Sequence, residues 1–294
     1  MKVGVIGLGT VGSAVLEGLR KYHEVSGYDK KSGKKKDFEK VLQSEVIFLC
    51  LPTPSALHGQ DLTVIENSLK EIFNGGFTGI LAIKSTILPG TIHKWTKIWK
   101  FGKFVACPEF LSADTAKDDF VKAKTICVGG DLPDCKKVIE AHKGLRITKF
   151  VIGSSIQMEM LKYVHNVFLA VKVGACNELY EVCTYLGLEY QGLMNVAADI
   201  TGWINPRHIK VPGKDNMLGF GGDCFPKDIH AFSEKFKHLD LEIITGTITS
   251  NRKRRKQAKK TVNNPIQIVD LNEGKTDASV SRTRRKSRGR KTQS

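Results

Sequence analysis

Cys224 is the residue whose sequence surroundings most favour chemistry. It lies in the segment GFGGDCFPKD, between a glycine-rich turn and Pro226, a residue that often begins a helix. At a helix N-terminus a thiol meets free N–H groups and the positive end of the helix dipole, and Lys227 adds positive charge. We expect both effects to lower the pKa of the Cys224 thiol and to favour a nucleophilic thiolate. Asp228 follows four residues later and could orient water or transfer protons.

Lys162 and Asn166 form a second candidate group. They are four residues apart in a helical pattern, so they share one face of the helix. A lysine and an amide on one face can stabilise a developing oxyanion between them. Such a pair alone is more often part of a solvated helix face. The presence of Cys224 in the same chain favours the functional interpretation.

A glycine-rich loop, GLGTVG, follows the first strand-like run and precedes the first helical one. Gly7 permits a tight turn, Gly9 lets the backbone approach a pyrophosphate, and Gly12 allows close packing of helix on strand. Asp29 ends the second strand-like run about 20 residues later, where a carboxylate binds ribose hydroxyls. The pattern predicts a dinucleotide site that prefers NAD to NADP. The two lysines after Asp29 could nevertheless tolerate a 2′-phosphate.

The elements that position these residues divide the chain in two. Short apolar runs alternate with helical patterns over residues 1–153, which predicts an α/β fold with a Rossmann-like, doubly wound parallel sheet. Residues 154–251 then read as an all-helical central domain. The expected strands are Val3–Ile6, Val46–Leu51, Ile80–Ile83, Phe104–Cys107 and Thr125–Val128; the expected helices are Thr10–Tyr22, Leu62–Phe73, Ser155–Gly187 and Tyr190–Thr201.

Composition excludes several classes of protein. The 294 residues are 41% hydrophobic and 26% charged, as in ordinary globular proteins, and no apolar run is long enough to span a membrane. The seven cysteines contain no CxxC pair, which predicts no metal site and suits a reducing cytoplasm. Of the 46 basic residues, 15 lie in residues 252–294, with only 3 of the 30 acidic ones. We expect this tail to be disordered and to be either a solvated end or a weak binder of polyanions.

From Met1 to about Asn251 the sequence resembles the UDP-glucose/GDP-mannose dehydrogenase family, and its UDP-glucose 6-dehydrogenase members most. The matching motifs occur in family order: GLGTVG, LPTP, KSTILPGT, PEFL, LKYVHN and HIKVPGKDNMLGFGGDCFPKD. The resemblance implies oxidation of the C6 hydroxymethyl group of a nucleotide sugar to a carboxylate, with two NAD reduced. UDP-glucose would become UDP-glucuronate, through a thiohemiacetal and then a thioester on Cys224.

The resemblance also assigns roles to residues. The catalytic set is Cys224, Lys162, Asn166, Asp228, Glu109 as acid/base, and Thr86, which holds a water. The cofactor contacts are Gly7, Gly9, Thr10, Val11, Gly12, Asp29, Thr53, Ser85, Thr86 and Lys227. The substrate contacts are Glu109, Phe110, Leu111, Lys162, Asn166, Arg207, Phe220 and Gly221. The family dimerises through its long helix, so we expect a homodimer in which Arg207 reaches the partner's substrate.

Three departures from the family pattern leave alternatives open. Ala113 stands where the family has a glutamate, and the acidic residue Asp114 follows one position later. The segment from Asp29 to Val46 is short, so we expect a helix over the cofactor cleft to be missing. The family's third domain, which binds the nucleotide sugar, is replaced by the basic tail. One alternative is a β-hydroxyacid or 6-phosphogluconate-like dehydrogenase, which would not need Cys224. Another is a non-catalytic protein that binds NAD or nucleic acid.

Overall fold

The computed structural model describes residues 1–56, 59–100, 102–202 and 204–256. These residues fall into two compact units, one made of residues 1–178 with 207–256 and the other of residues 179–206. The boundaries predicted at residues 153 and 251 rest on changes in sequence pattern and not on compactness, and they stay a prediction. Most of the predicted basic tail lies outside the described residues, as do its expected disorder and its binding of polyanions.

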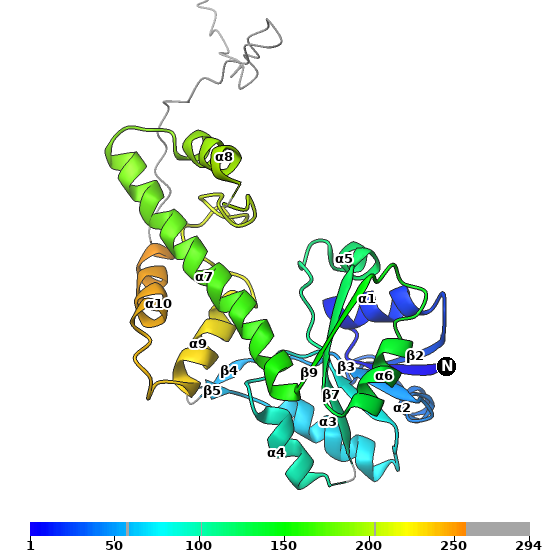
Figure 1. Ribbon diagram of the computed structural model, residues 1–294. Coiled ribbons are helices and arrows are strands. Elements are labelled where there is room, and N and C mark those ends of the chain that lie inside the picture. Colours follow the sequence, from blue (N-terminus) through cyan, green and yellow to red (C-terminus); the bar gives the residue numbers. More distant parts are fainter. Residues whose placement is uncertain (57–58, 101, 203, 257–294) are drawn as a thin grey trace, which may run out of the picture. The chain divides into compact units, whose positions relative to one another are not determined.

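A seven-stranded sheet with the order β2-β1-β3-β6-β7-β8-β9 organises the first part of the chain (Figure 1). The first five of these strands run parallel, which confirms the predicted fold class. The strand order reverses between β1 and β3, and ligands of such sheets bind beyond the carboxyl ends of the strands at that point. The strands are β1 (Lys2–Ile6), β2 (Glu24–Tyr28), β3 (Val46–Leu49), β6 (Ile80–Ile83), β7 (Lys103–Ala106), β8 (Thr125–Gly129) and β9 (Lys149–Gly153).

The sheet is mixed at one end, where the sequence predicted a parallel one. β8 pairs antiparallel with β7 through Ala106 and Gly129, and β9 then pairs parallel with β8. The connection before β8 contains only the seven-residue helix α5 (Ala116–Lys122), which packs against α1 (Thr10–Leu19). Because α5 does not carry the chain back along the sheet, β8 enters from the carboxyl edge. Apolar pattern alone does not reveal this reversal.

Two hydrophobic cores lie on opposite faces of the sheet. Alternate residues of one strand enter different cores, as the pleat requires: Val46 and Phe48 pack on one face, and Ile47 and Leu49 on the other. Burial on both faces explains why these strands read as continuous apolar runs. The covering helices include α1, α3 (Thr63–Asn74), α4 (Thr91–Ile98) and α6 (Leu132–Glu140).

The short segment between Asp29 and Val46 contains one helix, and the expected absence of a helix over the cofactor cleft stays a prediction. This helix, α2 (Lys35–Val41), has seven residues and buries Val41 against the sheet. The side chain of Asp37 accepts a hydrogen bond from the N–H of Lys34 at its start. A short β4–β5 hairpin (Ser55–Ala56 and Gly59–Gln60) follows β3.

The regular elements in the rest of the described chain are four helices: α7 (Ser155–Tyr185), α8 (Tyr190–Thr201), α9 (Phe225–Lys235) and α10 (Glu242–Arg254). The predicted bounds of α8 are those observed. α7 ends two residues before Gly187, whose φ of 71° stops the helix. Tyr163 and Val167 of α7 share a third core with residues of α9 and α10. Among the described residues, no helix combines the length and hydropathy needed to cross a bilayer.

Candidate functional site

The glycine loop has the geometry that its sequence predicted. Gly7 has a φ of 89°, and a Cβ there would lie 2.4 Å from the Cys50 carbonyl oxygen. A Cβ on Gly12 would lie 1.8 Å from the carbonyl oxygen of Gly7, so helix and loop need this glycine to pack. A Cβ on Gly9 would meet no atom within 4 Å, which leaves the start of α1 open. Thr10 and Val11 form the first turn, whose N–H groups suit a phosphate.

A cavity of about 420 Å³ adjoins this helix start. Among its lining residues are Ala113 and Asp114, which stand where the family pattern has a glutamate and the residue after it. Asp114 does not project freely, because it forms an ion pair with Lys214. The lining residues are Gly9, Thr10, Ser13 and residues 113–118. The cavity adjoins the first turn of α1, where the N–H groups of a helix start favour an anionic group such as a pyrophosphate.

Asp29 lies beside the glycine loop at the carboxyl end of β2. Its Oδ2 accepts a hydrogen bond from the Leu8 N–H at 2.9 Å, and its Oδ1 accepts one from the Lys31 N–H at 3.0 Å. The bond from Leu8 is the largest cause that lowers the pKa of Asp29, followed by the bond from Lys31. Lys30 forms a 2.8 Å ion pair with Glu71 of α3. Glu71 was not identified from the sequence. Its ion pair with Lys30 partly neutralises one of the two lysines that follow Asp29.

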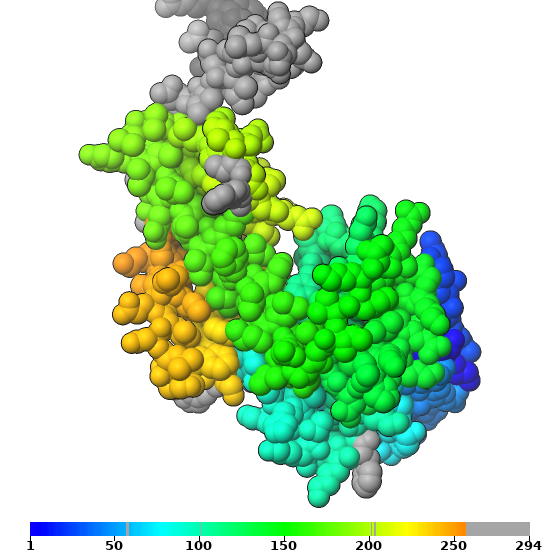
Figure 2. All heavy atoms as spheres, in the orientation of Figure 1, coloured from blue at the N-terminus to red at the C-terminus, as the bar shows by residue number. Residues whose placement is uncertain are grey.

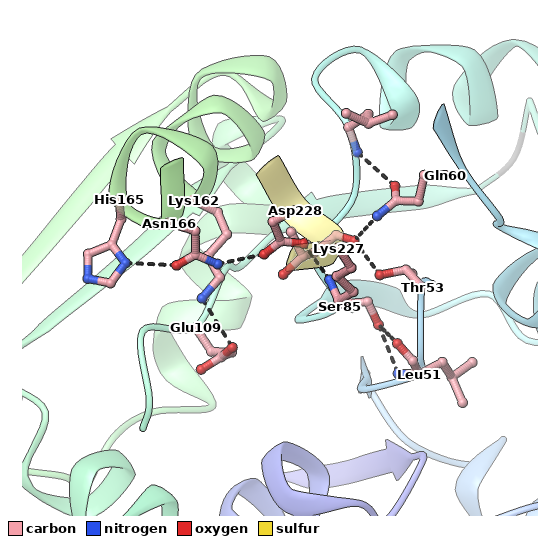
Figure 3. A network of polar contacts seen from close by, with 12 residues as sticks. Leu51, Thr53, Gln60, Ser85, Glu109, Lys162, His165, Asn166, Lys227 and Asp228 are labelled. Atoms are coloured by element: carbon pink, nitrogen blue, oxygen red, sulfur yellow. Dashed lines mark hydrogen bonds and ion pairs between the residues drawn. The ribbon is translucent and has the colours of Figure 1, made fainter. Parts of the chain in front are cut away.

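Hydrogen bonds from side-chain hydroxyl groups link the loop that follows β3 to the loop that follows β6. Ser85 Oγ accepts from the Leu51 N–H and donates to the Leu51 carbonyl, both at 2.8 Å. Thr53 Oγ1 donates to the Thr86 carbonyl at 2.7 Å (Figure 3). Gln60 Nε2 donates to the same carbonyl at 2.8 Å, a contact that no sequence motif indicated. The three predicted cofactor contacts in these loops are therefore adjacent in space.

Lys162 and Glu109 form a buried ion pair. The distance from Lys162 Nζ to Glu109 Oε1 is 3.3 Å, and the two side chains are 6% and 11% exposed. Glu109 Oε2 accepts the Leu111 N–H at 2.6 Å. Lys162 Nζ also lies over the ring of Phe110, 5.4 Å from its centroid. The structure thus brings together four residues of the predicted site.

Asn166 and Asp228 connect α7 to α9. Asn166 Nδ2 donates to Asp228 Oδ2 at 2.6 Å, and the Asp228 side chain is 1% exposed. The other oxygen of Asp228 forms an ion pair with Lys227, a residue that we expected to contact the cofactor. His165 Nδ1 lies 2.9 Å from Asn166 Oδ1, a contact that was not predicted from the sequence (Figure 3).

Cys224 is exposed at the N-cap of α9, as predicted, but its pKa is not lowered. Protein atoms that crowd the sulfur and exclude part of its water raise the pKa of the thiol, even though the side chain keeps a solvent-exposed surface. Lys162 and Lys227 oppose this rise, while Asp228 and Glu109 add to it. The expectation of a lowered pKa was wrong chiefly because burial disfavours the thiolate, and in addition because the charge of Asp228 offsets that of Lys227.

Two asparagines hold the loop before Cys224. Asn251 of α10 accepts the Phe220 N–H at 2.7 Å and donates to the Phe220 carbonyl at 3.0 Å. Asn177 of α7 accepts the Gly219 N–H at 2.7 Å. Phe220 is buried in the third core, and Gly221 follows it at intermediate exposure. Neither asparagine was identified from the sequence, because each contact joins distant segments.

The structure relates Arg207 to residues of α7 and α5. Its carbonyl accepts a hydrogen bond from Lys172 Nζ at 2.7 Å. Its charge also acts on Asp119 of α5, whose pKa is lowered first by the Ser112 N–H, then by the Thr115 hydroxyl and to a smaller degree by Arg207. The role of Arg207 in a partner's site therefore stays a prediction.

Known proteins resemble this chain in sequence and structure. It is 30% identical over 221 residues to UDP-glucose 6-dehydrogenase of Rickettsia conorii, a match over 72% of this chain and 50% of that protein. It is also 30% identical to GDP-mannose 6-dehydrogenase of Pseudomonas aeruginosa, over 70% of this chain and 50% of the other. The chain spans about half the length of these curated relatives. A UDP-glucose dehydrogenase from Pyrobaculum islandicum superposes with a TM-score of 0.74 at 24% identity, over 86% of this chain and 68% of that one, which shows the shared fold.

Two family models match consecutive parts of the sequence. Residues 17–143 match the NAD binding domain of the UDP-glucose/GDP-mannose dehydrogenase family, and residues 157–253 match its central domain. The first match and the named dehydrogenases indicate NAD as the cofactor, which agrees with the open glycine loop and with Asp29. Together the matches span about three quarters of the chain, and we conclude that it belongs to the UDP-glucose/GDP-mannose dehydrogenase family.

Proposed function

We propose that this protein is an NAD-dependent nucleotide-sugar 6-dehydrogenase that oxidises UDP-glucose to UDP-glucuronate. The observation that carries the proposal is the grouping of Lys162, Asn166 and Asp228 with Cys224 at the start of α9. These are the residue types that an alcohol-to-acid oxidation requires: a cation and an amide for an oxyanion, and a thiol for the aldehyde. The relatives from Rickettsia conorii and Pseudomonas aeruginosa are both 6-dehydrogenases, which supports the position of oxidation, and the former supports UDP-glucose as the sugar.

In this proposal Lys162 and Asn166 stabilise negative charge on the C6 oxygen. The amide of Asn166 has two N–H groups, and one is already donated to Asp228. The second N–H is left for the substrate oxygen. Glu109, paired with Lys162 at 3.3 Å, accepts the proton of the hydroxymethyl group, while the lysine limits the charge that builds up.

Cys224 acts on the aldehyde that the first oxidation produces. Its sulfur adds to the C6 carbonyl carbon, and the oxygen takes up a proton to give a thiohemiacetal. The second oxidation gives a thioester, which water hydrolyses to release the carboxylate and the thiol. The glycine loop, Asp29 and the loops at Thr53, Ser85 and Thr86 would hold NAD, which would supply the hydride acceptor for both oxidations. Because burial raises the pKa of Cys224, the nearby charge of Lys162 is needed to favour the thiolate.

We also propose that the active protein is a cytoplasmic homodimer. α7 carries large apolar side chains that remain exposed, among them Val164 at 53% and Phe168 at 71%. Much of this helix lies at the molecular surface on the face shown in Figure 2. A second copy that packs there would cover this surface, and it would bring Arg207 near the partner's substrate, as the family resemblance implies.

The experiment is a spectroscopic assay of NADH formation with UDP-glucose, UDP-N-acetyl sugars and GDP-mannose in parallel. We expect two NADH per UDP-glucose and an acid product. Cys224→Ala should abolish acid formation, whereas Cys183→Ala, which changes a thiol of α7, should not. One NADH per substrate that is independent of Cys224 would contradict the proposal and favour a β-hydroxyacid dehydrogenase. Turnover with GDP-mannose alone would contradict the substrate.

A further inference from the structure

We propose that His165 is a positioning residue that fixes the Asn166 side chain by donating a hydrogen bond from its Nδ1 to Asn166 Oδ1. The two residues are neighbours in α7, and the two atoms lie 2.9 Å apart (Figure 3). The role rests on the function proposed above for Asn166. It makes the orientation of the catalytic amide depend on a residue that does not itself touch the reacting atoms.

The hydrogen-bond partners of Asn166 determine which atom of its amide faces which neighbour. A carboxylate oxygen only accepts hydrogen bonds, so the NH₂ group of Asn166 must face Asp228 Oδ2, at 2.6 Å. The amide oxygen then faces His165, and two acceptors would repel each other there. His165 must therefore carry a proton on Nδ1, either in the neutral Nδ1–H tautomer or in the charged form.

Phe110 holds the imidazole in place although His165 is exposed. The two ring centroids are 5.3 Å apart, and the planes meet at 71° in an edge-on contact. Lys162 Nζ lies over the same Phe110 ring, so one aromatic side chain contacts both residues that flank the amide on this helix face. Because His165 is open to solvent, its side chain can be replaced without leaving a cavity in a core.

Loss of the Nδ1 donor should release the amide. Asn166 could then turn so that its oxygen approaches Asp228, and the N–H proposed for the substrate would point away. Asp228 would also lose a neutralising donor, and this carboxylate already acts on the nearby Cys224 thiol, together with Glu109, Lys162 and Lys227. A substitution of His165 should therefore change the reactivity of the Cys224 thiol through Asn166 and Asp228.

The test compares three variants of the full-length protein. His165→Phe keeps an aromatic ring against Phe110 but removes the donor. His165→Ala removes both, and its exposed site admits free imidazole. His93→Phe, at an exposed position of α4, is the matched control. We measure kcat and KM for UDP-glucose, and the rate at which iodoacetamide alkylates Cys224 between pH 6 and 10.

For His165→Phe we expect kcat to fall about fivefold with little change in KM, which is the size of one lost hydrogen bond. The alkylation profile of Cys224 should move to higher pH, and imidazole should restore most of the kcat of His165→Ala. A Cys224 profile unchanged from the parent protein in both variants would overturn the proposal. So would a rise in KM alone, which would make His165 a substrate contact. A shifted profile in a protein that turns over no nucleotide sugar would refute the proposed function and leave the positioning role supported.

Discussion

Replacing His142 by phenylalanine should make the free energy of unfolding less dependent on pH. His142 follows α6 and packs edge-on against Phe48 of β3, with ring centroids 5.4 Å apart. Its Nδ1 donates to the Val138 carbonyl at 2.7 Å, and its Nε2 is buried without a hydrogen-bond partner among the described residues. Burial, with a smaller effect of Lys84, lowers the pKa of His142 to about 3.

The direction follows from proton binding in the two states. An unfolded histidine has a pKa near 6.5, so between about pH 6.5 and pH 3 the unfolded chain binds a proton that the folded protein does not. The stability due to neutral His142 is therefore complete above pH 6.5 and decreases as the pH falls. The slope is about 1.4 kcal/mol per pH unit, so the parent should lose roughly 2 kcal/mol from this residue between pH 7 and pH 5.

Urea unfolding followed by circular dichroism at pH 7, 6 and 5 measures the effect. Other groups titrate in this range in both proteins, so the informative quantity is the difference in unfolding free energy between parent and variant. His142→Phe should gain on the parent by roughly 2 kcal/mol over the two pH units. His93→Phe, in which an exposed histidine is replaced, controls for the loss of an imidazole. A difference between parent and His142→Phe that stays constant from pH 7 to pH 5 would refute the reasoning.

Three further predictions concern the cofactor, the domain contact and assembly. Asp29→Asn should weaken NAD binding roughly tenfold and NADP binding less, measured by calorimetry, because a charged acceptor is lost; equal effects on both cofactors would exclude a ribose contact. Glu159 of α7 accepts hydrogen bonds from the N–H groups of Gly90 and Ile92 at 2.6 and 2.9 Å. Glu159→Gln should therefore lower the free energy of unfolding in urea by about 2 kcal/mol, and a decrease below a few tenths of a kcal/mol would contradict this. Sedimentation equilibrium at micromolar concentration should give twice 32.6 kDa, and Phe168→Glu should shift the protein toward monomer; a parent species at 32.6 kDa at every concentration would exclude the dimer.

Local patterns predicted the elements well. The apolar run Ile80–Ile83 is a strand with the predicted bounds, because a strand buried on both faces has no polar positions to obscure it. The four-residue spacing of Lys162 and Asn166 placed both side chains on one helix face, as observed. Helix ends were also close to prediction where a glycine with positive φ stops the helix, as at Gly187.

Features that depend on distant partners were not predicted. The reversal at β8 follows from where α5 packs, and the contact of Gln60 with the Thr86 carbonyl joins two loops. The pKa of Cys224 was predicted in the wrong direction because the sequence shows Lys227 beside the thiol, but shows neither the burial that raises the pKa nor the ion pair of Lys227 with Asp228. In each case local sequence identified the groups, and tertiary packing decided their partners.

The way in which Asn177 and Asn251 hold the loop before Cys224 has a consequence for how specificity could evolve. Both asparagines bind main-chain atoms, namely the Gly219 N–H and both polar groups of Phe220. A frame fixed through its backbone does not depend on the identity of the exposed side chains that it presents. Exposed residues of this loop, such as Lys210 and Met217, can therefore be exchanged to suit another sugar while the loop keeps its path to the reactive cysteine.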